Sequence, residues 1–336
     1  MRAVQIVEES GPDSALALVD VPEPAFSPEG EPSHPFTPGA GVLVEVHAAG
    51  VSFPELLQTR GQYQLKPPLP FVPGSEVAGV VLSASAGAQV RPGDRVAAFC
   101  ALGGFAETAV APEFFAFELS PKLDFAQGAG LILNYHTAYF ALLLRGRLKE
   151  GETVLVHGAA GGVGTASLQV ARGLGAKTIA LVSSEDKRAV AQRAGADHAL
   201  LLGEGWKDEV LELSGGGVDV VLDPVGGQRF TDSLRCLREG GRVVVVGFTG
   251  GSIPEVRVNR LLLRNTEVVG AGWGAYVMGK PQLNREIGAA INRMVDDGFV
   301  VPLVGERFPL EQAAQALKSL DERRATGKVV LDVRPA

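Results

Sequence analysis

A glycine-rich turn follows a short apolar run near the middle of the chain, and its composition suits the binding of a phosphate. The stretch Thr153–Gly164 reads Thr-Val-Leu-Val-His-Gly-Ala-Ala-Gly-Gly-Val-Gly, and Thr165–Leu174 carries Ala, Leu and Val at helical spacing. A strand, a bare turn and a helix bring backbone N–H groups and the positive end of a helix dipole to an anion. We expect a side chain at Gly161 or Gly162 to block a diphosphate, and a Cβ at Gly164 to push the helix off the strand.

The same stretch has a second interpretation that involves no ligand. Its glycines are spaced Gly158-x-x-Gly161-x-x-Gly164, which differs from the G-x-G-x-x-G pattern of dinucleotide-binding turns. Tight turns between a strand and a helix use glycine for purely structural reasons as well. The glycine pattern alone therefore leaves both interpretations open.

The residues after the next apolar run bear on the kind of dinucleotide. Thr178–Val182 begins about 20 residues after the first strand, the distance at which a dinucleotide fold places the residue that meets the adenosine ribose. An NAD enzyme usually has Asp or Glu there, whereas this run ends in Ser183 and Ser184, with Lys187 one turn later. Two small donors and a cation suit a 2′-phosphate. The sequence therefore favours NADP.

Two acidic residues keep an alternative open at this position. Glu185 and Asp186 lie between the serines and Lys187, and either carboxylate can turn toward the ribose. They are also the residue types that a helix dipole favours in a first turn, with Lys187 and Arg188 then on a solvated face.

Composition limits the classes of protein and of partner. A length of 336 residues corresponds to about two domains. The formal net charge of −7, without any run of Lys or Arg, disfavours a nucleic-acid partner. We expect a cytoplasmic protein with no membrane segment, because no apolar stretch reaches about 18 residues and the N-terminus is too short and strand-like for a signal peptide. Cys100 and Cys236 lack zinc-ligand spacing, and we expect neither a metal site nor a disulfide.

The first part of the chain is rich in strand-like runs. Short apolar or alternating runs bounded by Pro and Gly occupy Ala3–Val7, Ala15–Val19, Gly41–His47, Ser75–Ala84 and Arg95–Ala98. Between the second and third of these runs, Pro22–Pro38 carries six prolines. This segment is predicted to be a long surface loop of polyproline character.

From residue 126 onward, helix-like and strand-like segments alternate. Helices are predicted over Ala126–Leu144, Thr165–Leu174, Lys187–Arg193, Phe230–Leu237, Asn284–Asp297 and Leu310–Leu320. Strands are predicted over Thr153–His157, Thr178–Val182, His198–Leu202, Val218–Asp223, Arg242–Val246, Glu267–Gly270 and Lys328–Val333. Strands separated by helices imply an α/β fold with a doubly wound parallel sheet. The tail is expected to return to the first domain, which makes that domain discontinuous.

On these motifs the chain resembles the zinc-free branch of the medium-chain dehydrogenase/reductase superfamily, the NADPH:quinone oxidoreductases related to zeta-crystallin. The most specific piece is Val154–Gly164 followed by Gln169, Ala171 and Gly175-Ala176. Further matching pieces are Ala48–Leu57, Pro67–Val81, Asn134–Leu142, Val218–Gly227 and Arg324–Val330. The resemblance implies a discontinuous, β-rich GroES-like catalytic domain over 1–125 and 273–336. It also implies a Rossmann NADP-binding domain over 126–272, and a homodimer formed through the edge strand Glu267–Gly270.

The resemblance also bears on zinc. The alcohol-dehydrogenase branch has a Cys where this chain has Val51-Ser52-Phe53, and a four-Cys lobe soon after the residues near Gly93-Asp94. Neither feature is present in this sequence, and two cysteines cannot supply a site of that type. Metal-assisted alcohol oxidation is therefore not expected.

Carried over position by position, the resemblance implies a set of cofactor contacts. The pyrophosphate would meet Gly161, Gly162 and Val163, and the 2′-phosphate would meet Ser183, Ser184 and Lys187. The nicotinamide half would meet Thr137, Gly247, Phe248 and Thr249, with Arg324 reaching the cofactor and Lys328 assisting it. For Thr137 the alternative is a hydroxyl bonded to its own helix turn, and for Arg324 it is a solvated surface arginine.

The residues implied on the substrate side are Ser52 and Tyr63. Relatives often carry Asn in the stretch around Ser52; serine keeps a donor there but shortens its reach. Tyr63 corresponds to a family tyrosine that hydrogen-bonds the acceptor oxygen or supplies a proton, and simple packing is its alternative role. Trp273 and Tyr276 are candidates for an aromatic wall or for core and interface residues. His136 is expected to be structural rather than a general acid.

The function that the resemblance implies is hydride transfer from NADPH to a quinone or a related α,β-unsaturated carbonyl, without a metal. Most of the rate would come from aligning C4 of the nicotinamide with a small-molecule acceptor and from excluding water. Two alternatives remain at this point. One is an enoyl- or acrylyl-thioester (CoA) reductase of the same branch, and the other is a non-catalytic NADPH-binding protein with a structural or regulatory role.

Overall fold

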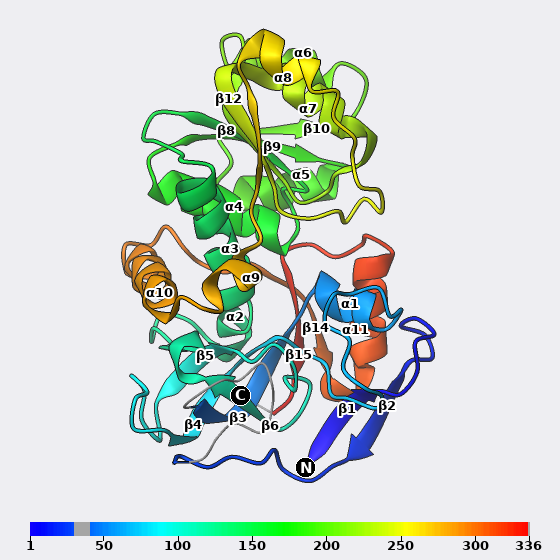
Figure 1. Cartoon of the computed structure of the whole chain (residues 1–336), viewed down its shortest axis with the longest axis vertical. Coiled ribbons are helices and arrows are strands. Elements are labelled where there is room, and N and C mark those ends of the chain that lie inside the picture. The colour runs from blue at the N-terminus through cyan, green and yellow to red at the C-terminus, as the bar shows by residue number, and fades with distance from the viewer. Residues whose placement is uncertain (30–40, 335–336) are drawn as a thin grey trace. The chain divides into compact units, whose positions relative to one another are not determined.

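The computed structural model describes residues 1–29 and 41–334 and shows two compact units (Figure 1). Unit 1 comprises Met1–Leu133, Lys280–Ala289 and Pro302–Ala336, and unit 2 comprises Asn134–Gly279 and Ala290–Val301. The chain thus leaves unit 1 at Leu133, later than the expected boundary at residue 125. It returns near residue 280 rather than at residue 273, and it crosses between the units again within the helix α10 (Pro281–Asp296).

Unit 1 is built on a seven-stranded sheet with the strand order β14-β15-β3-β4-β5-β7, in which β6 also pairs with β3. The pairing is antiparallel throughout, except that β14 and β15 are parallel. The strands are β3 (Gly41–Val51), β4 (Glu76–Ala84), β5 (Arg95–Phe99), β6 (Thr108–Pro112), β7 (Ala116–Glu118), β14 (Val304–Pro309) and β15 (Lys328–Asp332). A separate two-stranded ribbon joins β1 (Arg2–Ile6) to β2 (Leu16–Asp20).

The long strand β3 forms the centre of the unit 1 core. Val42, Val44 and Val46 alternate along it and are fully buried, as the period of two predicts for a strand with one face on a core. The α-helices that lie wholly among the described residues of this unit are α1 (Phe53–Gln58), α2 (Phe125–Gly128) and α11 (Ala313–Asp321). Because β15 pairs with β3, the C-terminal strand lies beside residues some 280 positions earlier in the sequence.

Unit 2 contains a six-stranded parallel sheet with the order β10-β9-β8-β11-β12-β13. The strands are β8 (Thr153–His157), β9 (Lys177–Val182), β10 (His198–Leu201), β11 (Val218–Asp223), β12 (Leu237–Val245) and β13 (Glu267–Gly270). The helices that lie wholly in this unit are α3 (Thr137–Tyr139), α4 (Gly162–Gly173), α5 (Glu185–Arg193), α6 (Trp206–Leu213), α7 (Phe230–Cys236), α8 (Asn259–Arg264) and α9 (Trp273–Val277). Every residue of β8 and β11 is buried, as near-continuous apolar strands in a parallel sheet should be.

The strand order reverses direction at β8. From β8 the chain builds outward through β9 and β10, and it then returns to the other side of β8 to build β11, β12 and β13. Neighbouring crossovers therefore diverge at the carboxyl end of β8. This switch point is where open α/β sheets bind ligands.

The structure corrects one predicted helix. Ala126–Leu144 is not a continuous α-helix: α2 ends at Gly128, and wide π-type turns at Ile132–His136 and Phe140–Arg145 flank the short α3. In a π-type turn the backbone hydrogen bond spans five residues rather than four. The spacing of apolar residues in this segment did not distinguish such turns from an α-helix. The elements α1, α6, α8, α9, β6, β7 and β14 were not predicted.

The structure tests only part of the predicted loop and does not test the predicted location. Residues 30–38 of the predicted loop Pro22–Pro38 lie outside the described residues. Within the described ranges, none of the helices combines the length and apolar character needed to cross a membrane. The cytoplasmic location stays a prediction.

Candidate active site

The glycine turn lies at the switch point of the parallel sheet in unit 2. It connects β8 to α4, and Gly161 is the residue that caps the N-terminus of α4. Gly158 adopts a left-handed conformation at φ +58°, and the Gly161 N–H donates to its carbonyl oxygen at 3.0 Å. This tight turn directs the first N–H groups of α4 out of the carboxyl end of the sheet, where an anion is stabilised by the helix dipole.

Gly161, Gly162 and Gly164 differ in how much space the protein leaves for a Cβ. A Cβ at Gly164 would lie 2.2 Å from the Gly158 carbonyl oxygen, so the expected clash between helix and strand is confirmed. A Cβ at Gly162 would lie 2.6 Å from the side-chain nitrogen of Asn134. At Gly161 the nearest atom is the Gly158 oxygen at 3.4 Å, and φ is an ordinary −82°. A Cβ at Gly161 would therefore make only an ordinary contact within the protein.

Asn134 lies against the glycine turn and was not among the residues predicted for the site. It lies in the first π-type turn, is buried, and contacts Gly162 in the first turn of α4. Turns of this type are frequent at functional sites. The next residue, Tyr135, donates its hydroxyl proton to Gln169 on α4 at 2.8 Å, so the same turn is tied to the same helix twice. Thr137 follows at the start of α3 and is buried.

The side chains at the carboxyl end of β9 form a small group of donors. Ser184 caps α5 by accepting from the Lys187 N–H at 3.4 Å, and the Lys187 ammonium donates to the Ser183 hydroxyl at 3.3 Å. Both serines are exposed. The structure thus brings together the three residues that the sequence assigned to a 2′-phosphate.

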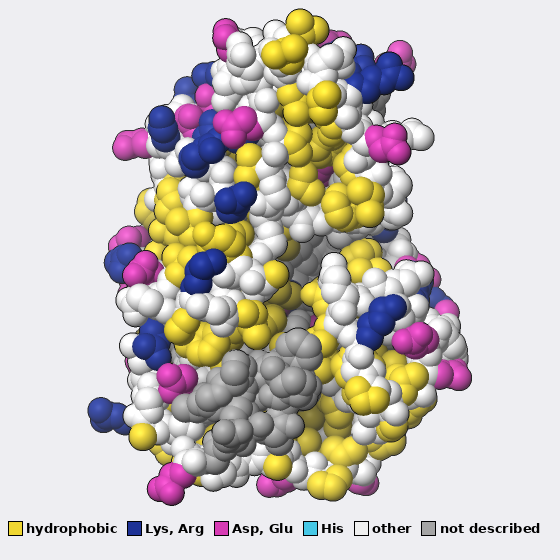
Figure 2. Space-filling model, in the orientation of Figure 1, with side chains coloured by type: hydrophobic (Ala, Val, Ile, Leu, Met, Phe, Trp, Pro, Cys, Tyr) yellow, Lys and Arg dark blue, Asp and Glu magenta, His cyan; other side chains and the backbone are white. Residues whose placement is uncertain are grey.

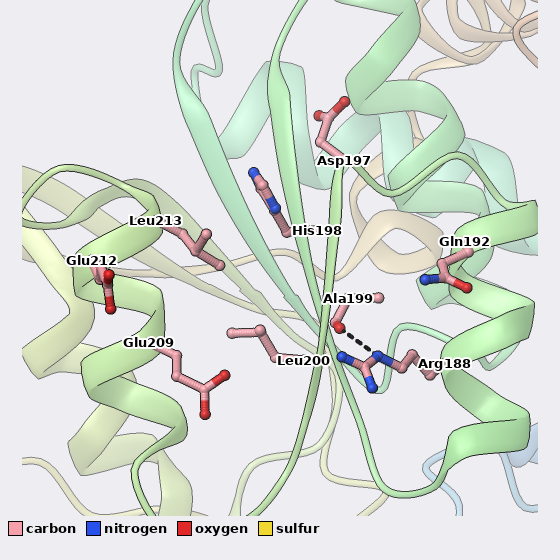
Figure 3. A pocket seen from close by; sticks show the side chains of 9 residues that line it. All are labelled: Arg188, Gln192, Asp197, His198, Ala199, Leu200, Glu209, Glu212 and Leu213. Atoms are coloured by element: carbon pink, nitrogen blue, oxygen red, sulfur yellow. Dashed lines mark hydrogen bonds between the residues drawn. The ribbon is translucent and has the colours of Figure 1, made fainter.

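Two charged neighbours of this group, Arg188 and Glu185, have partners of their own. Arg188 donates from Nε to the Ala199 carbonyl oxygen at 2.9 Å (Figure 3). It also pairs with Glu185 at 3.1 Å. Glu185 is therefore occupied by a cation of its own helix. A pocket of about 410 Å³ lies beyond Arg188, between α5, β10 and α6. Glu209 and Glu212 line it, so its charge does not suit a phosphate.

The loop after β12 is fixed to the loop after β11. Thr249 donates from both its backbone N–H and its hydroxyl to the Pro224 carbonyl oxygen, each at 3.1 Å. The Gly250 N–H donates to the Val225 carbonyl oxygen at 2.8 Å. These bonds hold Gly247, Phe248 and Thr249 at the same edge of the sheet as the glycine turn. The Phe248 side chain is 37% exposed.

In unit 1, Ser52 lies within a buried network of charged groups. The Lys328 ammonium donates to the Ser52 hydroxyl at 2.6 Å and forms an ion pair with Glu76. The Glu55 carboxylate accepts from the Ser52 N–H at 2.8 Å and from the Ser75 N–H and hydroxyl at 2.9 and 2.5 Å. Glu55, Glu76 and Lys328 are exposed by 1%, 0% and 3%.

Burial raises the pKa of the Glu55 carboxyl, against the opposing effects of the Ser75 hydrogen bond and the Lys328 charge. Tyr63 is half-buried, and its phenol has a raised pKa because of burial first and the Glu55 charge second. Burial also raises the pKa of the Cys100 thiol. A neutral phenol is the form of Tyr63 that can donate a hydrogen bond.

Arg324 has an exposed side chain. Its guanidinium donates to Glu322 at 2.7 Å, and its side chain is 56% exposed. Trp273 and His136 are buried, and their rings pack edge to face with the centroids 5.5 Å apart, so both belong to the interior of unit 2. The Tyr276 ring packs on the Phe140 ring, with the centroids 5.0 Å apart, and stays partly exposed.

A steric probe separates the ligand-related glycine from the structural one. For Gly161→Val we expect a loss of stability of no more than about 1 kcal/mol, because Val is a poorer N-cap than Gly but the backbone angle is ordinary and a Cβ meets no close atom. NADPH affinity should fall about a hundredfold, the equivalent of two lost hydrogen bonds to a charged group. Cofactor fluorescence titration and calorimetry measure both quantities.

Gly164→Ala serves as the contrasting variant. It should lose about 1–3 kcal/mol of stability through overpacking against Gly158. Unchanged NADPH affinity in Gly161→Val would contradict the assignment of the turn to a phosphate.

Comparisons with known proteins agree with this geometry. Residues 38–121 match the model of the alcohol dehydrogenase GroES-like domain, and residues 162–290 match that of zinc-binding dehydrogenases. The chain is 39% identical over 298 residues to quinone oxidoreductase-like protein 2 of Bos taurus, covering 87% of this chain and 85% of the relative. It is 35% identical to the quinone oxidoreductase of Rattus norvegicus, and the match covers 98% of this chain and 97% of that relative. A mycobacterial protein solved in complex with NADPH is 31% identical, with 99% and 100% coverage and a TM-score of 0.88.

The described residues hold no group of three or more His, Cys, Asp or Glu side chains arranged to bind a metal, although one matching model is named for zinc. The β-rich sheet of unit 1 is the GroES-like part of the fold, and the parallel sheet of unit 2 is the Rossmann part. The chain belongs to the medium-chain dehydrogenase/reductase superfamily, in its quinone oxidoreductase-like family.

Proposed function

We propose that the chain is an NADPH-dependent oxidoreductase that transfers hydride to quinones or related α,β-unsaturated carbonyls without a metal. The observation that carries this proposal is the bare turn at Gly161, where the protein leaves room for a side chain and none is present. The relatives named as quinone oxidoreductases, and a solved relative in complex with NADPH, support it. The fold places this turn at the switch point, where such sheets bind dinucleotides.

The residues of unit 2 fit the separate parts of NADPH. Gly161, Gly162 and Val163 face the pyrophosphate at the N-terminus of α4. The N–H groups of Gly162 and Val163 donate to it, while the Gly161 N–H closes the turn on Gly158. Ser183, Ser184 and Lys187 hold the 2′-phosphate with two hydroxyls and one cation. Thr137 and the loop of Gly247, Phe248 and Thr249 line the nicotinamide side. When bound, NADPH supplies the hydride, and the chain contributes orientation and the exclusion of water.

The acceptor side rests on two hydroxyls. Ser52 and Tyr63 donate hydrogen bonds to the acceptor oxygen, on which negative charge builds as the hydride arrives at the conjugated system. A quinone or enone delocalises that charge into its own oxygen, so no Lewis acid is needed. The roles of Arg324 and Lys328 at the cofactor stay predictions.

The acceptor class is tested by steady-state oxidation of NADPH and NADH with 1,4-naphthoquinone, trans-2-hexenal and crotonoyl-CoA. We expect the quinone or the enal to have the highest kcat/KM and NADPH to be preferred. Dialysis against a chelator should leave the rate unchanged. Preference for crotonoyl-CoA would instead favour a thioester reductase. Tight NADPH binding with no turnover of any acceptor would favour a non-catalytic role.

Lys187→Met tests the choice of cofactor. Loss of one charge-assisted contact should weaken NADPH binding about tenfold and leave NADH binding unchanged. Lys177→Met removes an exposed lysine at the opposite end of β9; it is the control and should alter neither affinity. Equal weakening of both cofactors would contradict a contact to the 2′-phosphate.

We also propose that the chain forms a homodimer through the open edge of the unit 2 sheet. The edge strand β13 and the neighbouring α8 expose apolar side chains, with Val268 at 37%, Leu262 at 75% and Leu263 at 77%. Figure 2 shows hydrophobic side chains gathered around the end of the molecule where α8 lies. An exposed strand edge beside apolar surface is favourable to cover, and a second copy does so by two-fold symmetry.

Light scattering tests the dimer. The native chain should have twice the mass of one chain, and Leu262→Glu with Leu263→Glu should reduce it to one chain because four buried charges would have no partners. Leu18→Glu on β2 changes an exposed leucine elsewhere and should leave the dimer intact. A native monomer, or a dimer that survives the double substitution, would contradict this interface.

A further inference from the structure

A lysine ammonium is buried beside Ser52, although the two residues are 276 positions apart in sequence. Lys328 is the first residue of β15, and its side chain is 4% exposed. It donates to the Ser52 hydroxyl at 2.6 Å and pairs with Glu76. The second oxygen of Glu76 accepts from the Leu133 N–H at 2.8 Å, so the carboxylate that balances the ammonium is itself held in place.

The donor and acceptor chemistry of this contact fixes the orientation of Ser52. An ammonium has only donors, so the Ser52 oxygen must accept, and the hydroxyl proton stays free to donate in another direction. The backbone of Ser52 is held independently, because its N–H donates to Glu55 at 2.8 Å. Two buried side chains from different elements therefore hold Ser52: Glu55 holds its backbone N–H, and Lys328 holds its hydroxyl oxygen.

The positive charge of Lys328 has a partner within the protein. Its positive charge is already balanced by Glu76, which is fully buried. A buried ion pair costs about as much in desolvation as it returns in attraction, so stability alone does not explain its presence. A conformational role at the hydroxyl it contacts explains it better.

We propose that Lys328 is a positioning residue that holds the Ser52 hydroxyl with its proton directed to the acceptor oxygen. This inference rests on the proposed reductase function. When hydride reaches the acceptor, the O–H bond of Ser52 breaks and its proton forms an O–H bond with the charged acceptor oxygen. One N–H bond of Lys328 breaks and restores the Ser52 hydroxyl. Water returns a proton to the lysine after the product leaves.

The test is a double-substitution cycle of Lys328→Met and Ser52→Ala, with NADPH and 1,4-naphthoquinone. Ser52→Ala should lower kcat about a hundredfold and Lys328→Met at least about tenfold, within the range of general acid catalysis. In the Ser52→Ala background, Lys328→Met should change kcat by less than about twofold, because both residues act at one hydroxyl. The dissociation constant of NADPH, measured by fluorescence without an acceptor, should stay within about twofold in every variant.

Two further variants guard against a purely structural effect. Lys328→Met paired with Glu76→Gln removes both charges and should fold with an unchanged melting temperature while keeping the loss of kcat. Lys318→Met removes an exposed cation of the same unit and should alter nothing.

Several outcomes would overturn the proposal while leaving the reductase function intact. The first is an unchanged kcat in the double variant Lys328→Met with Glu76→Gln. The second is that Lys328→Met lowers kcat by the same factor with and without Ser52→Ala. The third is a tenfold loss of NADPH affinity in Lys328→Met. A native chain that oxidises NADPH with none of the acceptors would overturn the reductase function and this role together.

Discussion

The close approach of α4 to the end of β8 is the contact on which the account depends. The helix comes so near the strand that a single methyl group at Gly164 would overlap the Gly158 carbonyl oxygen. The contact aims the unpaired N–H groups of the first helical turn out of the sheet. The strand order that diverges at β8 leaves space at the same point. Helix packing and anion binding are thus two results of one geometric constraint.

Unit 1 buries titratable side chains inside an apolar sheet. Glu55, Glu76 and Lys328 are almost fully buried, and each has partners whose hydrogen bonds offset part of the desolvation cost. The partners come from β15, β4 and the start of α1, so the network also joins the C-terminal strand to the middle of the sheet. Ser52 is the hydroxyl on which these charges converge.

Local patterns in the sequence predicted much of the fold. The limits of β8, β11 and β13 agree with the predicted runs, because each is a short run rich in β-branched residues. The group formed by Ser183, Ser184 and Lys187 was also predictable, since its members are close in sequence. The π-type turns were not, because no residue type in the segment marks where a helical turn widens by one residue. The Lys328 contact with Ser52 depends on pairing between β15 and β3, which spacing along the chain does not encode. Asn134 was missed for the same reason, as its partner is Gly162.

The most direct measurement of the central claim is a titration of the ¹⁵N-labelled protein with NADPH, followed by amide resonances. The account predicts that the amides of Gly162 and Val163 show the largest shifts, since a pyrophosphate would accept their hydrogen bonds, and that the Gly161 amide shifts because the ligand lies against it. The amides of Ser184 and Lys187 should shift with NADPH and much less with NADH. Saturation with NADPH that leaves the glycine-turn amides unmoved would contradict the account.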